Sequence, residues 1–556
     1  DALPIFEILF YRIKYNLLTI HVMKTNILFI SVIFLFATSC SDSFLDRTSL
    51  NNISEDTFWK TEEDALLGLA GCYDTFQSMY YEGPWGIGIM QYEAITDNAY
   101  FGWGHSLDDI CRGIHTPQTG VIYDFFKMHY KGIARCNKFI TNVESMVFDE
   151  AKKRRMLAEV KVLRANHYMH LSMTFGDVPL ITEPQTVINA NVPKTSRESI
   201  VSFIINDLKE AATALPTQDR IAGGEYGRLS KGAALGLLAR VYLYNDMFTE
   251  AAKAAKDVID MNYYELYPDY GRLFTPEAEQ SKEIIMSACF ERGIKPREGT
   301  RIGRWKGIVP PPFIVPLPDL LDDYYCIDGL PIDKSPLFKG DITQQPIYKD
   351  NVHNDFLKDT QRYVNRDPRM GFSIITHRTP WIKGEIIENG QVLYDAKNYT
   401  LTRCHFRKWV EETDLEMEDM PQDVYTLRYA DILLMRAEAL VRTGNYDYDE
   451  VLGLINQIRQ RPTVMMPIVQ DVEGKTKRLN SDELFEIIKH ERRIELVYEG
   501  HRYYDLIRWG ELERAWGEIF VPVNLRHYLG QKSLVWPLPE KEIEINDLLE
   551  QNELWK

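Results

Sequence analysis

The sequence has few cysteines, and none of them is spaced for chemistry. The 556-residue chain contains 7 cysteines, at positions Cys40, Cys72, Cys111, Cys136, Cys289, Cys326 and Cys404. No CxxC pair or other ligand spacing occurs, so the sequence indicates neither a zinc site nor a redox pair. His167 and His170 lie three apart on a predicted helix, but no acidic or third ligand is near them in sequence. We interpret them as packing or surface residues, and we expect no metal and no cofactor.

The chain also has fewer positively charged than negatively charged residues. The chain carries 64 lysines and arginines against 81 aspartates and glutamates, a net charge of −17 at pH 7. Nucleic-acid binding needs basic patches that neutralise phosphates, so we expect no nucleic-acid partner. The same total disfavours strongly anionic substrates, although a local basic patch could overrule it.

An apolar run stands near the N-terminus, and it is short. From Met23 the sequence reads MKTNILFISVIFLFATSC, in which the run 27–37 is too short for a comfortable transmembrane helix. A lysine before the run and small residues after it form the pattern of an export signal. Because Cys40 directly follows the small residues, we predict a lipoprotein signal peptide over 23–39 and a lipid on Cys40. The alternative is a soluble secreted protein. Residues 1–22 precede Met23 and are predicted to be upstream translation.

Helical patterns alternate with long irregular stretches. The spacing of apolar residues predicts helices over 122–146, 150–175, 193–216, 481–499 and 501–516, and helix pairs near 230–259 and 425–459. In the first pair, alanines recur where two helices would cross closely, at Ala233, Ala234, Ala239, Ala251 and Ala255. Such pairs resemble tetratricopeptide-type repeats. We predict an all-α fold with two regions, 40–262 and 263–556. The second carries a loop-rich insertion over 263–424, with a few short strands, before its closing helices.

The densest charged stretch is HERRIELVYEGHRYYDLIRWG, from His490 onward. A catalytic carboxyl group would need to be uncompensated, with a raised pKa, and to face a cleft. Here arginines match the acids nearly one for one, so we predict a structural ion-pair network. Glu491 falls within an apolar helical stripe and is predicted to be partly buried and paired. Arg492 with Glu495, or Glu499 with Arg502, could pair along the helix surface.

Several segments together resemble the SusD-like (RagB/SusD) family of outer-membrane nutrient-binding lipoproteins. They include TFWKTEEDALLGLAGCYDTF, EVKVLRANHYMHLSMTFGDVPLI, RYADILLMRAEAL and the charged stretch itself. The resemblance runs nearly the whole length from Cys40, and the number and order of the segments make it specific.

The resemblance implies a fold, a partner and a location. It implies tetratricopeptide-like helix pairs with a loop-rich face that supplies the ligand site. Members of the family are not enzymes; they cap a SusC-like, TonB-dependent barrel transporter and deliver glycans or peptides to it. A lipid at Cys40 would tether the chain to the outer membrane, facing the cell exterior.

Candidate ligand residues come from two loop regions. A glycan offers apolar C–H faces and many hydroxyl groups, so flat rings beside amides and carboxylates suit it. The segment ITDNAYFGWGHS (95–106) and the insertion supply such groups, and the predicted ligand-binding residues are Asp97, Asn98, Tyr100, Trp103, Trp305 and Trp381. Tyr324 and Tyr325 match a family segment that is interpreted as structural and are weaker candidates.

We therefore expect a cell-surface glycan-binding lipoprotein without catalytic activity. Two alternatives remain open. A peptide-binding or protein-binding helical-repeat lipoprotein would contact its ligand on a concave repeat face. A secreted carbohydrate-active enzyme would need two unpaired carboxylates facing each other in a cleft.

Overall fold

The computed structural model divides the chain into two compact units, Asp1–Lys60 and Thr61–Lys556. It describes residues 58–81, 88–102, 105–293, 314–342, 360–381, 386–394, 404–410, 421–472, 478–519 and 526–556. The predicted signal peptide and Cys40 lie outside the described residues, as do Trp103 and Trp305. The elements below belong to the second unit.

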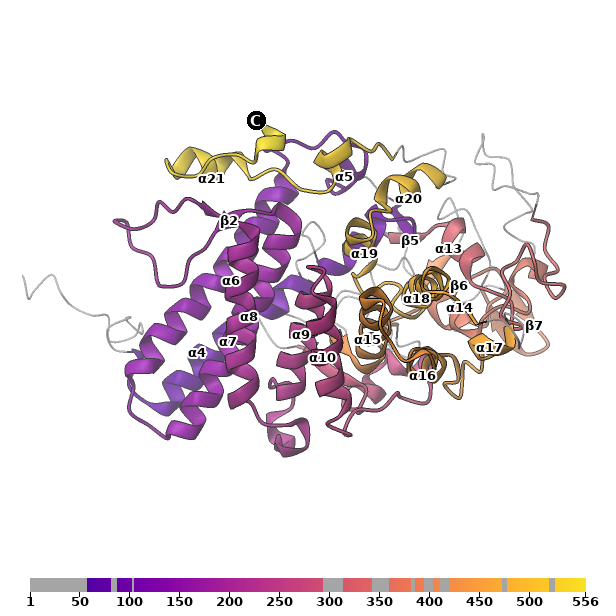
Figure 1. Ribbon diagram of the computed structural model, residues 1–556, viewed down its shortest axis with the longest axis horizontal. Helices are drawn as coiled ribbons and strands as arrows, with labels where there is room; N and C mark the ends of the chain where they lie inside the picture. The colour runs from indigo at the N-terminus through magenta and orange to yellow at the C-terminus, as the bar shows by residue number, and fades with distance from the viewer. Residues whose placement is uncertain are drawn as a thin grey trace, which may run out of the picture. The chain divides into compact units, whose positions relative to one another are not determined.

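The N-terminal region is a row of helices. They are α4 (Glu62–Tyr81), α6 (Gly120–Ser145), α7 (Glu150–Phe175), α8 (Arg197–Ala214), α9 (Lys231–Leu243) and α10 (Phe248–Ile259), with the short α5 (Asp108–Cys111) between α4 and α6. From α6 to α10 each helix packs on the next along the chain, and Figure 1 shows them side by side. Local sequence sets the helix starts: Asp149, Ser196 and Ser230 cap α7, α8 and α9 through their side-chain oxygens. The alanines predicted at the α9–α10 crossing are fully buried, which confirms that expectation.

The C-terminal region supplies further helices. They are α15 (Tyr429–Thr443), α16 (Tyr448–Arg459), α17 (Val469–Val472), α18 (Ser481–Glu495), α19 (Arg502–Arg508), α20 (Leu512–Glu518) and α21 (Glu540–Ile545). Helix α10 packs on α15, and α15 in turn packs on α16 and α18, so α15, α16 and α18 extend the row (Figure 1). The described part of the chain contains no helix that is both long and apolar enough to span a membrane.

Two predicted helices end earlier than expected. The helix predicted to reach Glu499 stops at Glu495, because Tyr498 has φ of 60° and Gly500 has φ of 82°. A side chain at Gly500 would also lie 2.6 Å from Ile89, so the turn there has room only for glycine. The helix predicted over 501–516 is divided into α19 and α20 around Gly510, whose φ is 71°.

In the part of the chain that the structure describes, the strands form five small antiparallel pairs. The pairs are β1 (Ala99–Phe101) with β5 (Ile314–Pro316), β2 (Val178–Pro179) with β3 (Lys194–Thr195), β4 (Ile284–Ala288) with β10 (Val424–Arg428), β6 (Ile374–Ile375) with β9 (His405–Phe406), and β7 (Ile386–Glu388) with β8 (Gln391–Leu393). Three short helices accompany them, α11 (Tyr270–Leu273), α13 (Pro318–Asp323) and α14 (Pro368–Ser373). The predicted fold class, a helical scaffold with a loop-rich part carrying short strands, is confirmed.

The β4–β10 pair explains how the insertion leaves the helical row intact. Strand β4 follows the α9–α10 pair in the chain, and β10 runs directly into α15. Because the two strands bond to each other, the chain returns to the place it left, and α15 can pack on α10. The β1–β5 pair has a different effect, since it ties the segment around Tyr100 to the insertion.

Candidate binding site

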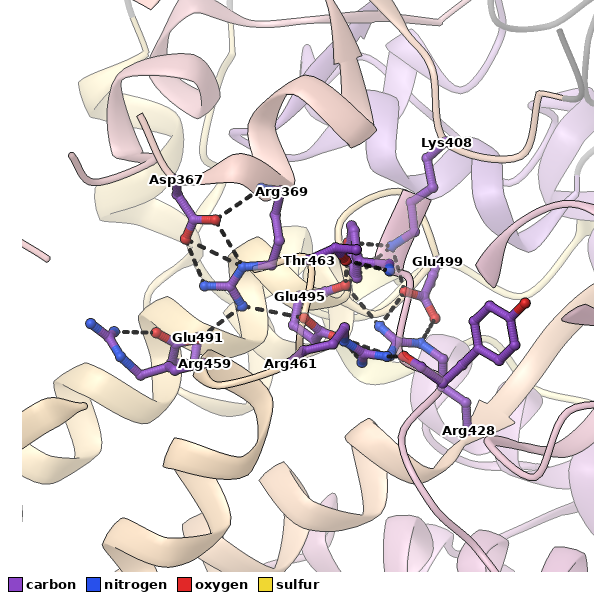
Figure 2. Close-up of polar contacts among 12 residues, drawn as sticks. Asp367, Arg369, Lys408, Arg428, Arg459, Arg461, Thr463, Glu491, Glu495 and Glu499 are labelled. Atoms are coloured by element: carbon purple, nitrogen blue, oxygen red, sulfur yellow. Dashed lines mark hydrogen bonds and ion pairs between the residues drawn. The ribbon is translucent and has the colours of Figure 1, made fainter. Parts of the chain in front are cut away.

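A buried ion-pair network surrounds the end of α18, as Figure 2 shows. Arg369 bonds Glu491 at 2.9 Å and Glu495 at 3.2 Å. Arg428 bonds both Glu495 and Glu499 at 2.8 Å. These side chains are at most 2% exposed. We call this cluster the ion-pair network, and its members are Glu283, Asp367, Arg369, Lys408, Arg428, Arg459, Arg461, Glu491, Glu495 and Glu499.

The ion-pair network confirms the structural interpretation of the charged stretch. Burial by itself would raise the pKa of Glu491, but Arg369 and Arg459 lower it to about 2. Such a carboxyl group is ionised and compensated, whereas a glycosidase acid needs a raised pKa. Glu491 is paired, as predicted, and it is fully buried where partial burial was predicted.

The predicted pairs along the helix surface are wrong. Arg492 bonds Asp431 at 2.9 Å and Asp505 at 3.0 Å. Arg502 bonds Asp97 at 2.7 Å instead of Glu499. The arginine side chains are buried and therefore bond acids on other elements of the fold. In addition, α18 ends at Glu495 and α19 begins at Arg502, so Glu499 and Arg502 do not lie on one helix.

A cleft of about 820 Å³ lies beside the ion-pair network. Parts of the chain that are far apart in sequence form its walls: Asp97, the segment from α13 to Ile342, Arg362, and residues of α18, α19 and α20. This volume is in the range of ligand sites in proteins. The cleft is the candidate binding site.

Asp97 lies deep in the cleft and is held by two arginines. Arg502 donates two hydrogen bonds to its carboxylate, at 2.9 and 2.7 Å, and Arg493 lies 3.2 Å away. Burial would raise the pKa of Asp97, but the two guanidinium groups hold it well below its usual range. Arg493 also bonds Asp323 at 3.0 Å and the Asn98 side-chain oxygen at 2.7 Å. Asn98 itself is fully buried.

The two predicted aromatic residues that the structure describes are packed in the interior. Tyr100 is 1% exposed in β1 and packs with Val315 and Leu317. Trp381 is 5% exposed and packs with Ile375 and Val410. Both rings are covered by neighbouring side chains, so the structure gives them packing contacts where the sequence suggested ligand contacts. A direct role of either ring in binding stays a prediction, one that this burial does not favour.

A ring pair that the sequence interpretation ranked low lines the cleft instead. Tyr325 stacks on His490, with ring centroids 3.8 Å apart and planes inclined by 16°. Both rings are half-buried, and His490 Nε2 bonds the Asp323 carbonyl oxygen at 2.8 Å. Tyr324 is fully buried. Tyr324 has an extended backbone after α13, and one tyrosine packs inside while the next lines the cleft; the DDYY sequence contains both rings but does not show which one is open.

Comparison with known proteins identifies the family. The family described as "SusD family" matches residues 282–555, and the one described as "Starch-binding associating with outer membrane" matches residues 44–243. The chain belongs to the SusD/RagB family. Among the residues that the structure describes in this SusD/RagB protein, no group of three histidine, cysteine or acidic side chains is arranged to hold a metal ion.

Relatives match nearly the whole SusD/RagB protein. SusD-like protein P38 of Formosa agariphila is 26% identical over 546 residues, covering 95% of this chain and 98% of that protein. Starch-binding protein SusD of Bacteroides thetaiotaomicron is 25% identical over 464 residues, covering 76% and 77%. The crystal structure of a SusD-like carbohydrate-binding protein from Bacteroides fragilis superposes with a TM-score of 0.74 at 27% identity, covering 89% of this chain and 100% of that one.

Proposed function

We propose that this SusD/RagB protein captures oligosaccharides or polysaccharides in the cleft and delivers them to a SusC-like, TonB-dependent transporter. In this proposal a lipid on Cys40 anchors it to the outer membrane, facing the cell exterior. The observation that carries the proposal is the cleft with its half-buried ring pair, in a chain whose relatives are named for starch and carbohydrate binding.

The cleft has the chemistry that sugar rings require. Tyr325 and His490 offer ring surface for the C–H face of a pyranose, and nearby Ile332 and Ile487 add apolar wall. Carboxylates along the opening can accept hydrogen bonds from sugar hydroxyl groups. The combination of apolar wall and a few polar groups is typical of small-molecule sites.

The buried residues near Asp97 would act by positioning the predicted platforms. Phe101 lies opposite Ile314 in the β1–β5 pair, so the chain leaves β1 and enters β5 at the same end of the pair. Trp103 follows β1 in sequence, and Trp305 precedes β5. Asp97 fixes the segment before β1 to Arg493 and Arg502. Ligand contact by Trp103 and Trp305 is part of the proposal.

The carboxylates of the cleft favour binding over catalysis. Burial would raise the pKa values of Asp97 and Asp323, but neighbouring arginines lower both. Glu93, whose pKa burial raises to about 7, does not line the cleft; it accepts hydrogen bonds from Asn98 and the Tyr498 backbone. A general acid would need its raised pKa at the site itself. We therefore propose that the protein is not an enzyme.

The test is binding of the chain from Ser41 onward, which contains the whole compact unit Thr61–Lys556. Polysaccharides, oligosaccharides and peptides would be compared by affinity electrophoresis and calorimetry. Trp103→Ala and Tyr325→Ala are expected to weaken glycan binding. Tyr263→Ala is the matched control, because this half-buried ring packs on Tyr264 outside the cleft.

Each outcome has a distinct meaning. Saturable glycan binding that either cleft variant weakens supports the proposal. Glycan binding that survives both variants would place the site elsewhere. Binding of peptides alone would favour the helical-repeat alternative.

A further inference from the structure

The charged groups that line the cleft are unequal in number. Among the described residues that line it, nine are aspartates or glutamates and five are lysines or arginines, so this part of the lining has four more negative groups than positive ones. The net charge of the whole chain has the same sign, and the described residues of the cleft wall do not form the local basic patch that could have overruled it.

Each of the five cations already has a carboxylate partner. Arg493 and Arg502 share Asp97, at 3.2 and 2.7 Å. Arg362 bonds Asp322, with its Nε 3.0 Å from the nearer oxygen. Their guanidinium groups are therefore committed to the protein before any ligand arrives.

The remaining two cations belong to α18 and α20. Lys489 bonds Glu511 and, at 2.5 Å, Glu486. Arg514 lies between Glu511 at 2.9 Å and Glu518 at 2.7 Å. Every lysine and arginine that the structure describes in the cleft wall therefore has an acidic partner.

The acidic side chains at the cleft also differ from the basic ones in how far they are exposed to solvent. Four of the five cationic side chains are no more than 11% exposed, whereas Glu486 is 70% exposed and Glu518 is 62% exposed. Glu486 is therefore far more open to a ligand than its partner Lys489, which is 10% exposed, whereas Glu518 and its partner Arg514, which is 56% exposed, are open to a similar degree. Sugar hydroxyl groups can donate hydrogen bonds to these oxygens, but a ligand carboxylate or sulfate would be repelled and would lose its own hydration.

We infer that the cleft selects uncharged glycans and rejects glycans that carry carboxylate or sulfate groups. This inference rests on the proposed function and adds the substrate class. The specificity-determining residues are Glu486 and Glu518, two exposed acids on α18 and α20.

The first test compares polysaccharides that share a backbone and differ in charge. The pairs are starch with carboxymethyl starch, laminarin with sulfated laminarin, and dextran with dextran sulfate. We expect at least one neutral parent to bind, and its charged derivative to bind at least about tenfold more weakly at low salt. Raising the salt concentration should narrow the gap, because ions screen the repulsion.

A charge variant then locates the effect. The double variant Glu486→Gln/Glu518→Gln should raise the affinity for the charged derivative, relative to its neutral parent, by roughly tenfold. The matched control is Glu550→Gln/Glu553→Gln, which removes the same charge from two exposed acids that pair with Lys556 outside the cleft. This control should leave the ratio as it is in the unmodified protein.

Two results would overturn the inference, and they differ from each other. A charged derivative that binds as tightly as its parent at low salt would refute charge selection and leave glycan binding standing. Failure of every glycan, neutral or charged, to bind would refute the proposed function and the inference with it.

Discussion

The ion-pair network and the cleft are both rich in charge, and both are built on α18. In the network, Glu491 and Glu495 are fully buried and each bonds at least two arginines. One to three turns earlier, on the exposed face of the same helix, Glu486 is 70% exposed and bonds one lysine. The difference is that the first set of charges is closed to solvent and the second is open to a ligand. Charge density in a sequence does not by itself mark a functional site.

The largest loss of stability should come from removing an arginine of the ion-pair network. Arg428→Ala removes the partner that Glu283, Glu495 and Glu499 share in the interior. Uncompensated buried carboxylates are expensive, so we expect a loss of about 3–5 kcal/mol in the free energy of unfolding. Chemical denaturation of the purified variant measures it.

Arg514→Ala is the matched change in the cleft. Its side chain is 56% exposed, and its loss should change stability by only about 0–1 kcal/mol. If the two arginine variants had similar stability, the distinction between the buried ion-pair network and the solvent-exposed cleft would be wrong.

Acid titration should separate the same two regions. The carboxyl group of Glu491 has an ordinary pKa of 4.5 and a folded pKa of about 2, because Arg369 and Arg459 outweigh burial. Below about pH 4.5 the unfolded chain takes up the proton first. The contribution of Glu491 to the free energy of unfolding is therefore complete above pH 4.5. As the pH falls toward 2, this contribution of roughly 3 kcal/mol is lost. Denaturation midpoints from pH 7 to pH 3 measure the loss.

Buried histidines should lower the stability of the protein at a higher pH than the buried carboxyl groups do. Burial lowers the pKa of His167 from 6.5 to about 3, so stability should begin to fall below about pH 6.5, where the unfolded chain binds a proton that the folded chain does not. The expected profile is a shallow decline from pH 6.5 to 4.5 and a steeper one below. A flat profile down to pH 3.5 would contradict the buried ion-pair assignment.

Asp97 stands at the boundary between the two regions, and its substitution should affect both stability and binding. Asp97→Asn keeps the shape but leaves Arg502 without its acidic partner, while Arg493 keeps Asp323. We expect a loss of about 1–3 kcal/mol in stability and weaker glycan binding, because the segment before Trp103 loses its anchor. The control is Asp257→Asn, which changes an exposed acid that pairs with Lys253 outside the cleft. Full glycan affinity in Asp97→Asn would remove the positioning role.

The scaffold could be predicted because its signals are local. Apolar spacing and caps such as Ser196 and Ser230 mark the helices, and the alanines of α9 and α10 mark their crossing. The structural nature of the charged stretch also follows from local composition, since arginines and acids alternate there. The ion-pair partners of these acids could not be predicted from local composition. Arg369 and Arg428 come from distant parts of the chain, and only the tertiary fold brings them to α18.

The candidate site could be predicted only in part. The segment at Asp97 was located, and Asp97 does line the cleft. Which rings face the ligand could not be read, because β1 has three residues, too few to show an alternation of inward and outward side chains. Both faces of that strand are covered, so Tyr100 is buried, whereas Tyr325 next to a buried tyrosine reaches the cleft.

The smallest expected effect completes the comparison. Glu486→Gln should change the free energy of unfolding by less than about 0.5 kcal/mol, because its side chain is 70% exposed and Lys489 keeps Glu511 as a partner. Glu491→Gln, five positions along the same helix, removes a fully buried charge from between Arg369 and Arg459 and should cost about 3–5 kcal/mol. Denaturation of the two variants side by side measures the difference. Equal losses would mean that Glu486 supports the fold, and it could then no longer be assigned to ligand selection.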